Sequence, residues 1–337
     1  MSMTIETVPK QPAYDYSFDK QFRKRRSMEV GSKSVDYLLI CPPPDRVTSD
    51  VPLIIAPGFT ENPDLLKKML KKEYDDGRSV FTLSYPRQKL DTESNGLPQA
   101  QDQKIEVTLA LINQARRFNP DNPDEERKSQ GKVDIAGRSD GGVNAALSAV
   151  KRPEWIDTLT LIDTKLTASE NPLSLTERFF EHAKLEGKEI FKHPLKQTYL
   201  VHGIEQAFNY VARHPSQSIQ EIAALAHTDI RRELPSLREK GVLIYGIHGS
   251  GDSIFPMRDL QKGVAEAGGN QEDPEILKKI GLSRKDTKST NQPKILFDGF
   301  YSATDNIGHA SIYNNDKYIN LISHVIKAAR AKSEKNI

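Results

Sequence analysis

A serine stands in the middle of a glycine-rich segment, Gly137-Arg138-Ser139-Asp140-Gly141-Gly142. An apolar run ends just before this segment, and a stretch with one apolar stripe, typical of a helix, follows it. A serine in a tight strand-to-helix turn needs small residues two positions before and after it, because its backbone angles are unusual and neighbouring elements approach closely. Gly137 and Gly141 meet this requirement. The pattern predicts that Ser139 is a nucleophile, with a helix-capping serine as the alternative interpretation.

A nucleophilic serine needs a base, and the base needs an acid that orients it, because an unassisted hydroxyl is almost fully protonated at neutral pH. Asp252 follows an apolar run that ends at Ile247, and His309 lies before the last helical stretch of the chain. We expect His309 to be the base and Asp252 the acid. Asp163 also ends an apolar run and is the alternative acid. Taken singly, these residues could equally be turn aspartates and a capping histidine.

The elements that must position these side chains are strands and helices in alternation. Apolar runs predict eight short strands, at 28–30, 35–40, 51–56, 80–85, 133–136, 159–162, 242–247 and 295–297. Apolar residues at helical spacing predict helices at 64–76, 98–118, 143–150, 256–267 and 319–329. After an antiparallel start, this alternation is typical of a mostly parallel eight-stranded α/β sheet flanked by helices. The carboxyl ends of parallel strands share one edge, so Ser139, Asp252 and His309 should meet there.

The chain is predicted to divide into a core, an insertion and a short extension. Residues 165–235 contain helical stretches and six aromatic side chains but no strong strand pattern, which indicates a helical cap. Residues 27–164 and 236–337 then form the α/β core, and residues 1–26 an N-terminal extension. A polar stretch at 268–292 is expected to be a surface insertion.

Together these residues resemble the α/β-hydrolase superfamily over about residues 28–330. Three motifs carry the resemblance: Gly137 to Gly141 as a nucleophile elbow, the His-Gly-x-x-Asp segment at 248–252, and the Gly-His pair at 308–309. The order Ser, Asp, His is that of the family. The resemblance implies an eight-stranded sheet, a lid after the sixth strand, and Asp252 rather than Asp163 as the acid.

The resemblance also implies an oxyanion hole built from two backbone N–H groups. One would belong to Asp140, which follows the nucleophile, and the other to Phe59, which follows Pro57-Gly58. Family members often carry His-Gly in place of that pair, so Thr60 is the alternative to Phe59. We expect the Asp140 carboxylate to point away from the oxyanion. We expect Arg138 to form a surface ion pair, with a substrate carboxylate as the alternative partner.

Composition excludes several classes of protein. The 48 basic and 46 acidic side chains nearly cancel, which argues against a nucleic-acid binder and against attraction to an acidic membrane. No apolar run approaches the roughly 20 residues of a membrane span, so no stable membrane insertion is expected. A single cysteine, Cys41, and the lack of a secretory pattern at the N-terminus favour a cytoplasmic protein.

No cofactor or metal is expected. The chain has no phosphate loop and no dinucleotide-binding fingerprint, and five histidines between positions 182 and 227 lack the i, i+4 spacing of a metal pair.

The sequence therefore predicts a serine hydrolase that cleaves an ester-like acyl substrate through an acyl-enzyme intermediate. Thioester hydrolysis, carbon–carbon bond hydrolysis and acyl transfer are alternatives on the same three residues, and a non-catalytic binding protein is the alternative outside enzymes. The aromatic residues of the cap favour a small-molecule substrate with an apolar or aromatic group. The oligomeric state stays open.

Overall fold

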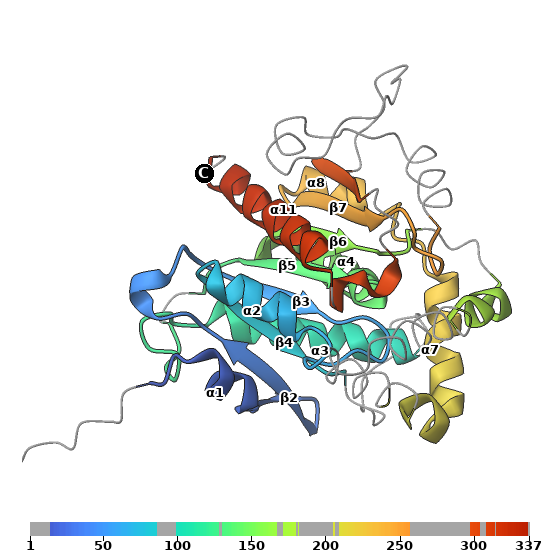
Figure 1. Ribbon diagram of the computed structural model, residues 1–337, viewed down its shortest axis with the longest axis horizontal. Helices are drawn as coiled ribbons and strands as arrows, with labels where there is room; N and C mark the ends of the chain where they lie inside the picture. Colours follow the sequence, from blue (N-terminus) through green and yellow to red (C-terminus); the bar gives the residue numbers. More distant parts are fainter. Residues whose placement is uncertain are drawn as a thin grey trace, which may run out of the picture.

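The computed structural model describes residues 14–85, 99–127, 130–166, 171–179, 181, 205, 209–256, 297–303, 308–313 and 315–335 (Figure 1). The strands are β1 (Arg26–Val30), β2 (Lys33–Ile40), β3 (Ser49–Ala56), β4 (Arg78–Leu83), β5 (Val133–Arg138), β6 (Ile156–Ile162), β7 (Leu243–Gly249) and β8 (Gly299–Ala303). The principal helices are α1 (Phe18–Arg23), α2 (Lys67–Asp75), α3 (Gln99–Arg116), α4 (Asp140–Lys151), α7 (Pro215–His227), α8 (Leu234–Glu239) and α11 (Asp316–Lys335). Short 3-10 helices lie at Pro44–Arg46 (η1), Pro153–Trp155 (η2) and His309–Tyr313 (η4).

All eight strands form one sheet in the order β1-β2-β4-β3-β5-β6-β7-β8. Strand β2 runs antiparallel to both of its neighbours, and the remaining pairs are parallel. The predicted fold class, a mostly parallel sheet with an antiparallel start, is confirmed.

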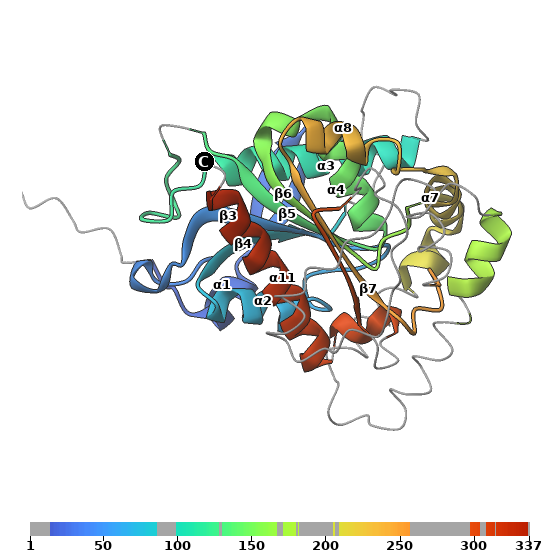
Figure 2. The same ribbon diagram turned by 90° about the horizontal axis from the view of Figure 1, so that it is seen from above.

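Helices cover both faces of the sheet (Figure 2). Helices α1, α2 and α11 lie on one face, and α3, α4 and α8 lie on the other. Strand β3 shows why its sequence is continuously apolar: Ile54 and Ala56 pack toward α3 and α4, whereas Leu53 and Ile55 pack toward α2 and α11. A strand covered on both faces needs apolar residues at every position.

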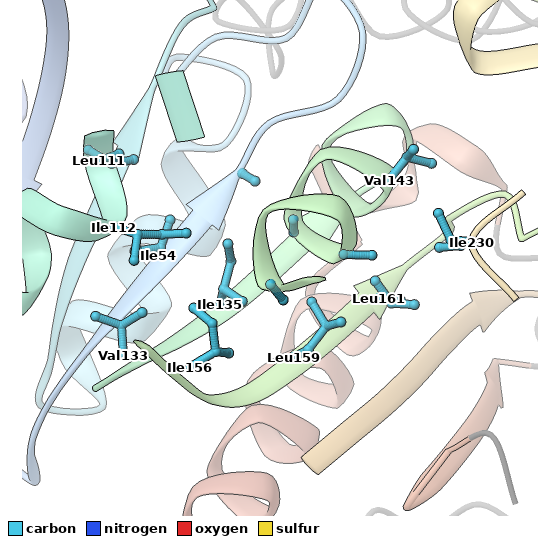
Figure 3. Packing of buried hydrophobic residues seen from close by; sticks show 14 of the residues in the cluster. Ile54, Leu111, Ile112, Val133, Ile135, Val143, Ile156, Leu159, Leu161 and Ile230 are labelled. Atoms are coloured by element: carbon cyan, nitrogen blue, oxygen red, sulfur yellow. The ribbon is translucent and has the colours of Figure 1, made fainter. Parts of the chain in front are cut away.

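The apolar layer under α3 and α4 fixes the helix that begins at the candidate nucleophile (Figure 3). Val143 on α4 belongs to the same buried cluster as Ile135 on β5 and Leu159 on β6. Each of these three side chains is at most 1% exposed. The start of α4 is therefore held firmly against the centre of the sheet.

The structure differs from the predictions at the last strand and at the N-terminal helix. Of the predicted last strand at 295–297, only Phe297 lies among the described residues, and it precedes β8, which begins at Gly299. Phe297 and Phe300 belong to the same buried cluster, and Tyr301 packs on the other face of the sheet, so an apolar pattern does not distinguish Phe297 from the residues of β8. Helix α1 lies within the predicted extension 1–26, yet it buries Phe18 and Phe22 against α2.

Several other predictions fall on parts of the chain outside the description. These are the polar stretch at 268–292, the helix at 256–267 beyond its first residue, and residues 167–170, 180, 182–204 and 206–208 of the predicted cap, which therefore stays a prediction. Within the described residues, no helix combines the length and the apolar character that a membrane crossing requires.

Candidate active site

The candidate nucleophile sits between β5, which ends at Arg138, and α4, which begins at Asp140. Ser139 has φ 53° and ψ −124°, a left-handed backbone conformation that side chains disfavour. Its N–H donates to the Ile162 carbonyl at 2.8 Å, and its carbonyl accepts the Gly142 N–H at 3.0 Å. These bonds hold the strained residue in place.

The neighbouring glycines are required for steric reasons. A Cβ on Gly137 would lie 2.5 Å from the carbonyl oxygen of Gly141, and a Cβ on Gly141 would clash with the carbonyl oxygens of Ala56 and Pro57. The close approach of β3, β5 and α4 therefore excludes any side chain at these two positions.

The three predicted side chains meet at the carboxyl edge of the sheet. Asp252 follows β7, and His309 begins η4 after β8. His309 Nδ1 lies 2.7 Å from Asp252 Oδ2, and His309 Nε2 lies 3.1 Å from Ser139 Oγ. An ionised carboxylate can only accept, so Nδ1 donates to Asp252, and Nε2 is left to accept the serine proton. All three side chains are buried, with exposed fractions of 1% for Ser139 and 4% for Asp252 and His309.

Asp252 is ionised because its neighbours outweigh its burial. Burial opposes the charge, but the nearby His309 with its hydrogen bond, together with His248 and the Phe255 N–H, holds the pKa of Asp252 below its usual value. Oδ1 accepts the N–H groups of Ile254 at 2.8 Å and Phe255 at 2.9 Å. Both oxygens are thus engaged, which fixes the carboxylate under the imidazole.

The carboxylate of Asp163, the alternative acid, has hydrogen-bond partners other than His309. Its Oδ1 accepts the Gly249 N–H at 2.9 Å and the Tyr318 hydroxyl at 2.7 Å. Burial raises the pKa of Asp163, although His248 acts in the opposite direction. Asp163 has φ 45° and follows β6 directly. The geometry therefore joins Asp252, and not Asp163, to His309 Nδ1.

Asp163, His248 and Asp252 offer ligand atoms that lie within 4.8 Å of one another, the spacing of a metal site. However, Asp252 uses both oxygens, and His248 Nε2 donates to the Phe255 carbonyl at 2.7 Å. Of this cluster, Asp163 Oδ2 and His248 Nδ1 are the atoms without a hydrogen-bond partner among the described residues. Two open atoms fall short of the four ligands that a structural zinc site takes, so the cluster does not fit a metal centre.

The loop after β3 carries the predicted oxyanion donors. The Gly58 N–H donates to a Glu61 carboxylate oxygen and is therefore occupied. Thr60 has φ 60°, and Asp140 is the first residue of α4, where helix N–H groups have no acceptor within the helix. The N–H groups of Asp140 and of Phe59 or Thr60 stay our candidates for the hole.

The carboxylate of Asp140 pairs with Lys104 on α3 at 2.6 Å, and the same ammonium lies 2.6 Å from Glu221 on α7. Burial disfavours a charge on Lys104, but these two carboxylates outweigh it and raise its pKa above the usual value. The ammonium also lies 5.6 Å from the centre of the Phe59 ring. Lys104 thus joins three elements next to the nucleophile.

The expected surface ion pair of Arg138 is wrong. Arg138 is 2% exposed and pairs with Glu61, and its Nη1 also donates to the Tyr313 hydroxyl at 2.9 Å. Sequence reasoning missed Glu61, Tyr313 and Lys104, because no local pattern marks partners that lie far away along the chain.

A hollow opens beside the loop after β3. It includes Gly58, and a Cβ added to this glycine would lie 3.1 Å from the Cβ of Ser139. The other residues that line it are polar or carry a hydroxyl group: Thr60, Glu61, Asn62, Ser84, Tyr85, Lys104, Tyr210 and Glu221.

Comparison with solved structures gives matches over nearly the whole chain. A putative lipase from Acinetobacter baumannii AYE is 17% identical with a TM-score of 0.58, and the match covers 97% of this chain and 99% of the lipase. A carboxylesterase of Nitrososphaera gargenis is 15% identical with a TM-score of 0.57, covering 93% and 100%. MGS-M2, an alpha/beta hydrolase enzyme from a deep-sea metagenome library, is 12% identical with a TM-score of 0.57, covering 91% and 97%.

No protein-family model matches the sequence, and neither does any curated protein. At these identities the structural matches establish a shared fold, and the chemistry has to be argued from the residues themselves.

Proposed function

We propose that this chain, which has the α/β-hydrolase fold, is a serine hydrolase that cleaves an ester-like acyl compound through an acyl-enzyme intermediate. The observation that carries the proposal is the continuous hydrogen-bonded series from Ser139 Oγ through His309 to Asp252. The distances of 3.1 and 2.7 Å lie in the range for proton transfer and for orientation of the base.

In the proposed reaction, Ser139 Oγ attacks the acyl carbonyl carbon while its proton moves to His309 Nε2. Asp252 stabilises the resulting imidazolium, and the carbonyl electron pair moves onto the oxygen, which the Asp140 and Phe59 N–H groups bind. Collapse of this intermediate expels the alcohol, which takes the proton from His309. Water then attacks the acyl carbon, gives its proton to His309, and the acid leaves as Ser139 regains a proton.

We infer a polar group on the acyl part of the substrate, because charged, amide and hydroxyl groups line the hollow beside Gly58. This inference departs from the apolar or aromatic group that the aromatic residues of the predicted cap favour. An apolar chain would displace water from these charged, amide and hydroxyl groups and leave them without partners.

Paired substrates of equal length test this inference. We expect a higher kcat/KM for p-nitrophenyl methoxyacetate than for p-nitrophenyl butyrate, after each value is divided by the rate constant for hydroxide, which removes intrinsic reactivity. A normalised preference for butyrate would contradict the polar substrate and leave the mechanism unaffected.

A fluorophosphonate probe tests the proposed function itself, because such probes bond covalently to an activated serine. We expect labelling of the native chain and of Ser148→Ala, and none of Ser139→Ala or His309→Ala. Ser148 is a suitable control, since it is a buried serine on the same helix whose Oγ donates to the Ile105 carbonyl. A folded native chain that takes no label would indicate a binding protein instead.

A further inference from the structure

Arg138, the residue directly before the nucleophile, contacts two other parts of the candidate active site. Its Nη1 donates to the Glu61 carboxylate and to the Tyr313 hydroxyl, and its Nη2 donates to the backbone carbonyl of His309. The guanidinium also lies 4.8 Å from the centre of the Tyr313 ring. One side chain therefore joins β5 to the loop after β3 and to η4.

Glu61 extends this connection into the loop that holds the proposed oxyanion donors. One carboxylate oxygen accepts from Arg138 and from the Tyr313 hydroxyl, and the other accepts the Gly58 N–H. The Glu61 N–H in turn donates to the Gly58 carbonyl at 3.2 Å. Hydrogen bonds between Gly58 and Glu61 therefore hold the loop, and Arg138 holds the Glu61 side chain in place.

The two charges of this pair are buried, with exposed fractions of 2% for Arg138 and 5% for Glu61. A buried pair of this kind adds little stability over apolar residues of similar size, so stability alone does not account for it. A guanidinium presents several donors in a rigid plane, which suits contact with a carboxylate and a carbonyl at once. A lysine ammonium has no such fork.

We propose that Arg138 is a positioning residue that sets His309 and the Phe59 loop at their reacting distances from Ser139. The inference rests on the proposed serine hydrolase function. Arg138 acts on the backbone of His309 and on Glu61, and these place the imidazole and the N–H groups that act on the substrate.

The test compares Arg138→Lys and Arg138→Ala with the native chain on p-nitrophenyl butyrate. A small displacement of base and oxyanion donors lowers kcat, so we expect a loss of about 100-fold in kcat with KM changed by less than about threefold. Added guanidinium ion should partly restore kcat in Arg138→Ala and leave Arg138→Lys unchanged. A role in stability alone predicts neither the rescue nor the separation of kcat from KM.

Arg78→Lys is the matched control. Arg78 is also 2% exposed and pairs with Asp134 at 2.6 Å, but it begins β4, at the opposite end of the parallel strands from Ser139. We expect this variant to melt at a lower temperature and to keep its kcat.

A variant without the buried charges keeps the proposal testable if Arg138→Ala fails to fold. Arg138→Gln with Glu61→Gln removes both charges together, so neither is left unpaired. We expect this double variant to fold and to stay slow. A native kcat in the folded double variant or in Arg138→Lys would overturn the positioning role. A native chain that fluorophosphonate does not label would instead overturn the proposed serine hydrolase function.

Discussion

Asp252 and Asp163 are both buried carboxylates at the carboxyl ends of neighbouring strands, yet they have different partners. Asp252 accepts from His309 Nδ1, whereas Asp163 accepts from the Gly249 N–H and the Tyr318 hydroxyl. Replacing one carboxylate oxygen by an NH2 group, as in Asp→Asn, therefore has different consequences at the two positions.

We expect Asp252→Asn to lose about 10⁴-fold in kcat, because an amide that donates to the imidazole favours the wrong tautomer. Asp163→Asn should lose far less, since an amide oxygen can still accept from Gly249 and Tyr318. Rates of p-nitrophenyl butyrate hydrolysis by folded variants measure both. The reverse ranking would make Asp163 the acid.

The sequence predicts the residues with a local pattern and leaves out those that depend on distant contacts. Ser139 is flanked by glycines that its own turn requires, and Asp252 and His309 follow strands in an order that topology explains. Glu61 meets Arg138 across 77 positions and Tyr313 across 252, and no spacing rule links them. The predicted surface position of Arg138 was wrong because a charged residue at the end of a strand gives no sign of a buried partner.

At the scale of the elements, the position of the candidate nucleophile depends on how closely β3, β5 and α4 approach one another. Gly141 lies where α4 meets the end of β3, and a methyl group there would strike backbone atoms, which cannot move aside as a flexible side chain can. Gly131, before β5, has no atom within 4 Å of the same added group.

We expect Gly141→Ala to lower the free energy of unfolding by at least about 1–3 kcal/mol, because the added carbon overpacks the contact. Gly131→Ala should instead raise it by about 0.4–1 kcal/mol, since alanine reduces the freedom of the unfolded chain. Urea denaturation of the two variants measures the contrast. Equal changes in the free energy of unfolding for the two variants would show that the close approach of β3, β5 and α4 does not restrict the size of residue 141.

Strands covered on both faces are easier to predict than β8, the last strand, which lies at one edge of the sheet. Continuous apolar runs predict the positions of β3 and β7 closely, because a strand buried on both faces requires apolar residues at successive positions. The sequence predicts a strand that includes Phe297, because Phe297 is as apolar as Phe300 of β8, and both are buried, at 1% and 5% exposed. Burial alone does not distinguish strand residues from the residues that lead into a strand.

At the scale of the whole molecule, the candidate active site occupies the carboxyl edge of the sheet, and other buried ionisable groups lie away from it. Glu73 on α2 is 0% exposed, and neither carboxylate oxygen has a hydrogen-bond partner among the described residues. Burial raises the pKa of Glu73, although the nearby charge of Arg78 acts against it.

The raised pKa makes stability depend on pH in a defined direction. The folded chain holds this proton more tightly than the unfolded chain, so stability from Glu73 is greatest below its usual pKa and falls as pH rises toward the raised value. Glutamine has no proton to lose. We therefore expect Glu73→Gln to stabilise the chain more at about pH 8 than at about pH 4, on either side of the usual glutamate range.

Thermal melting over this pH range measures the effect. Glu29→Gln is the control, because Glu29 is exposed on β1 and its variant should show no such trend. A gain from Glu73→Gln that is constant with pH would mean that the pKa of Glu73 is the same in the folded and unfolded chains, which would contradict the raised pKa.

The described non-glycine residues with positive φ are Thr60, Ser139 and Asp163, and they follow β3, β5 and β6 at the edge where the chemistry is proposed. Each such conformation costs about 1–3 kcal/mol, which glycine would largely relieve. Selection for heat tolerance alone would therefore favour glycine at these positions and would remove the hydroxyl of Ser139, the proposed nucleophile, in the process. A thermophilic descendant that still turns over substrate would have to gain its stability in other parts of the chain.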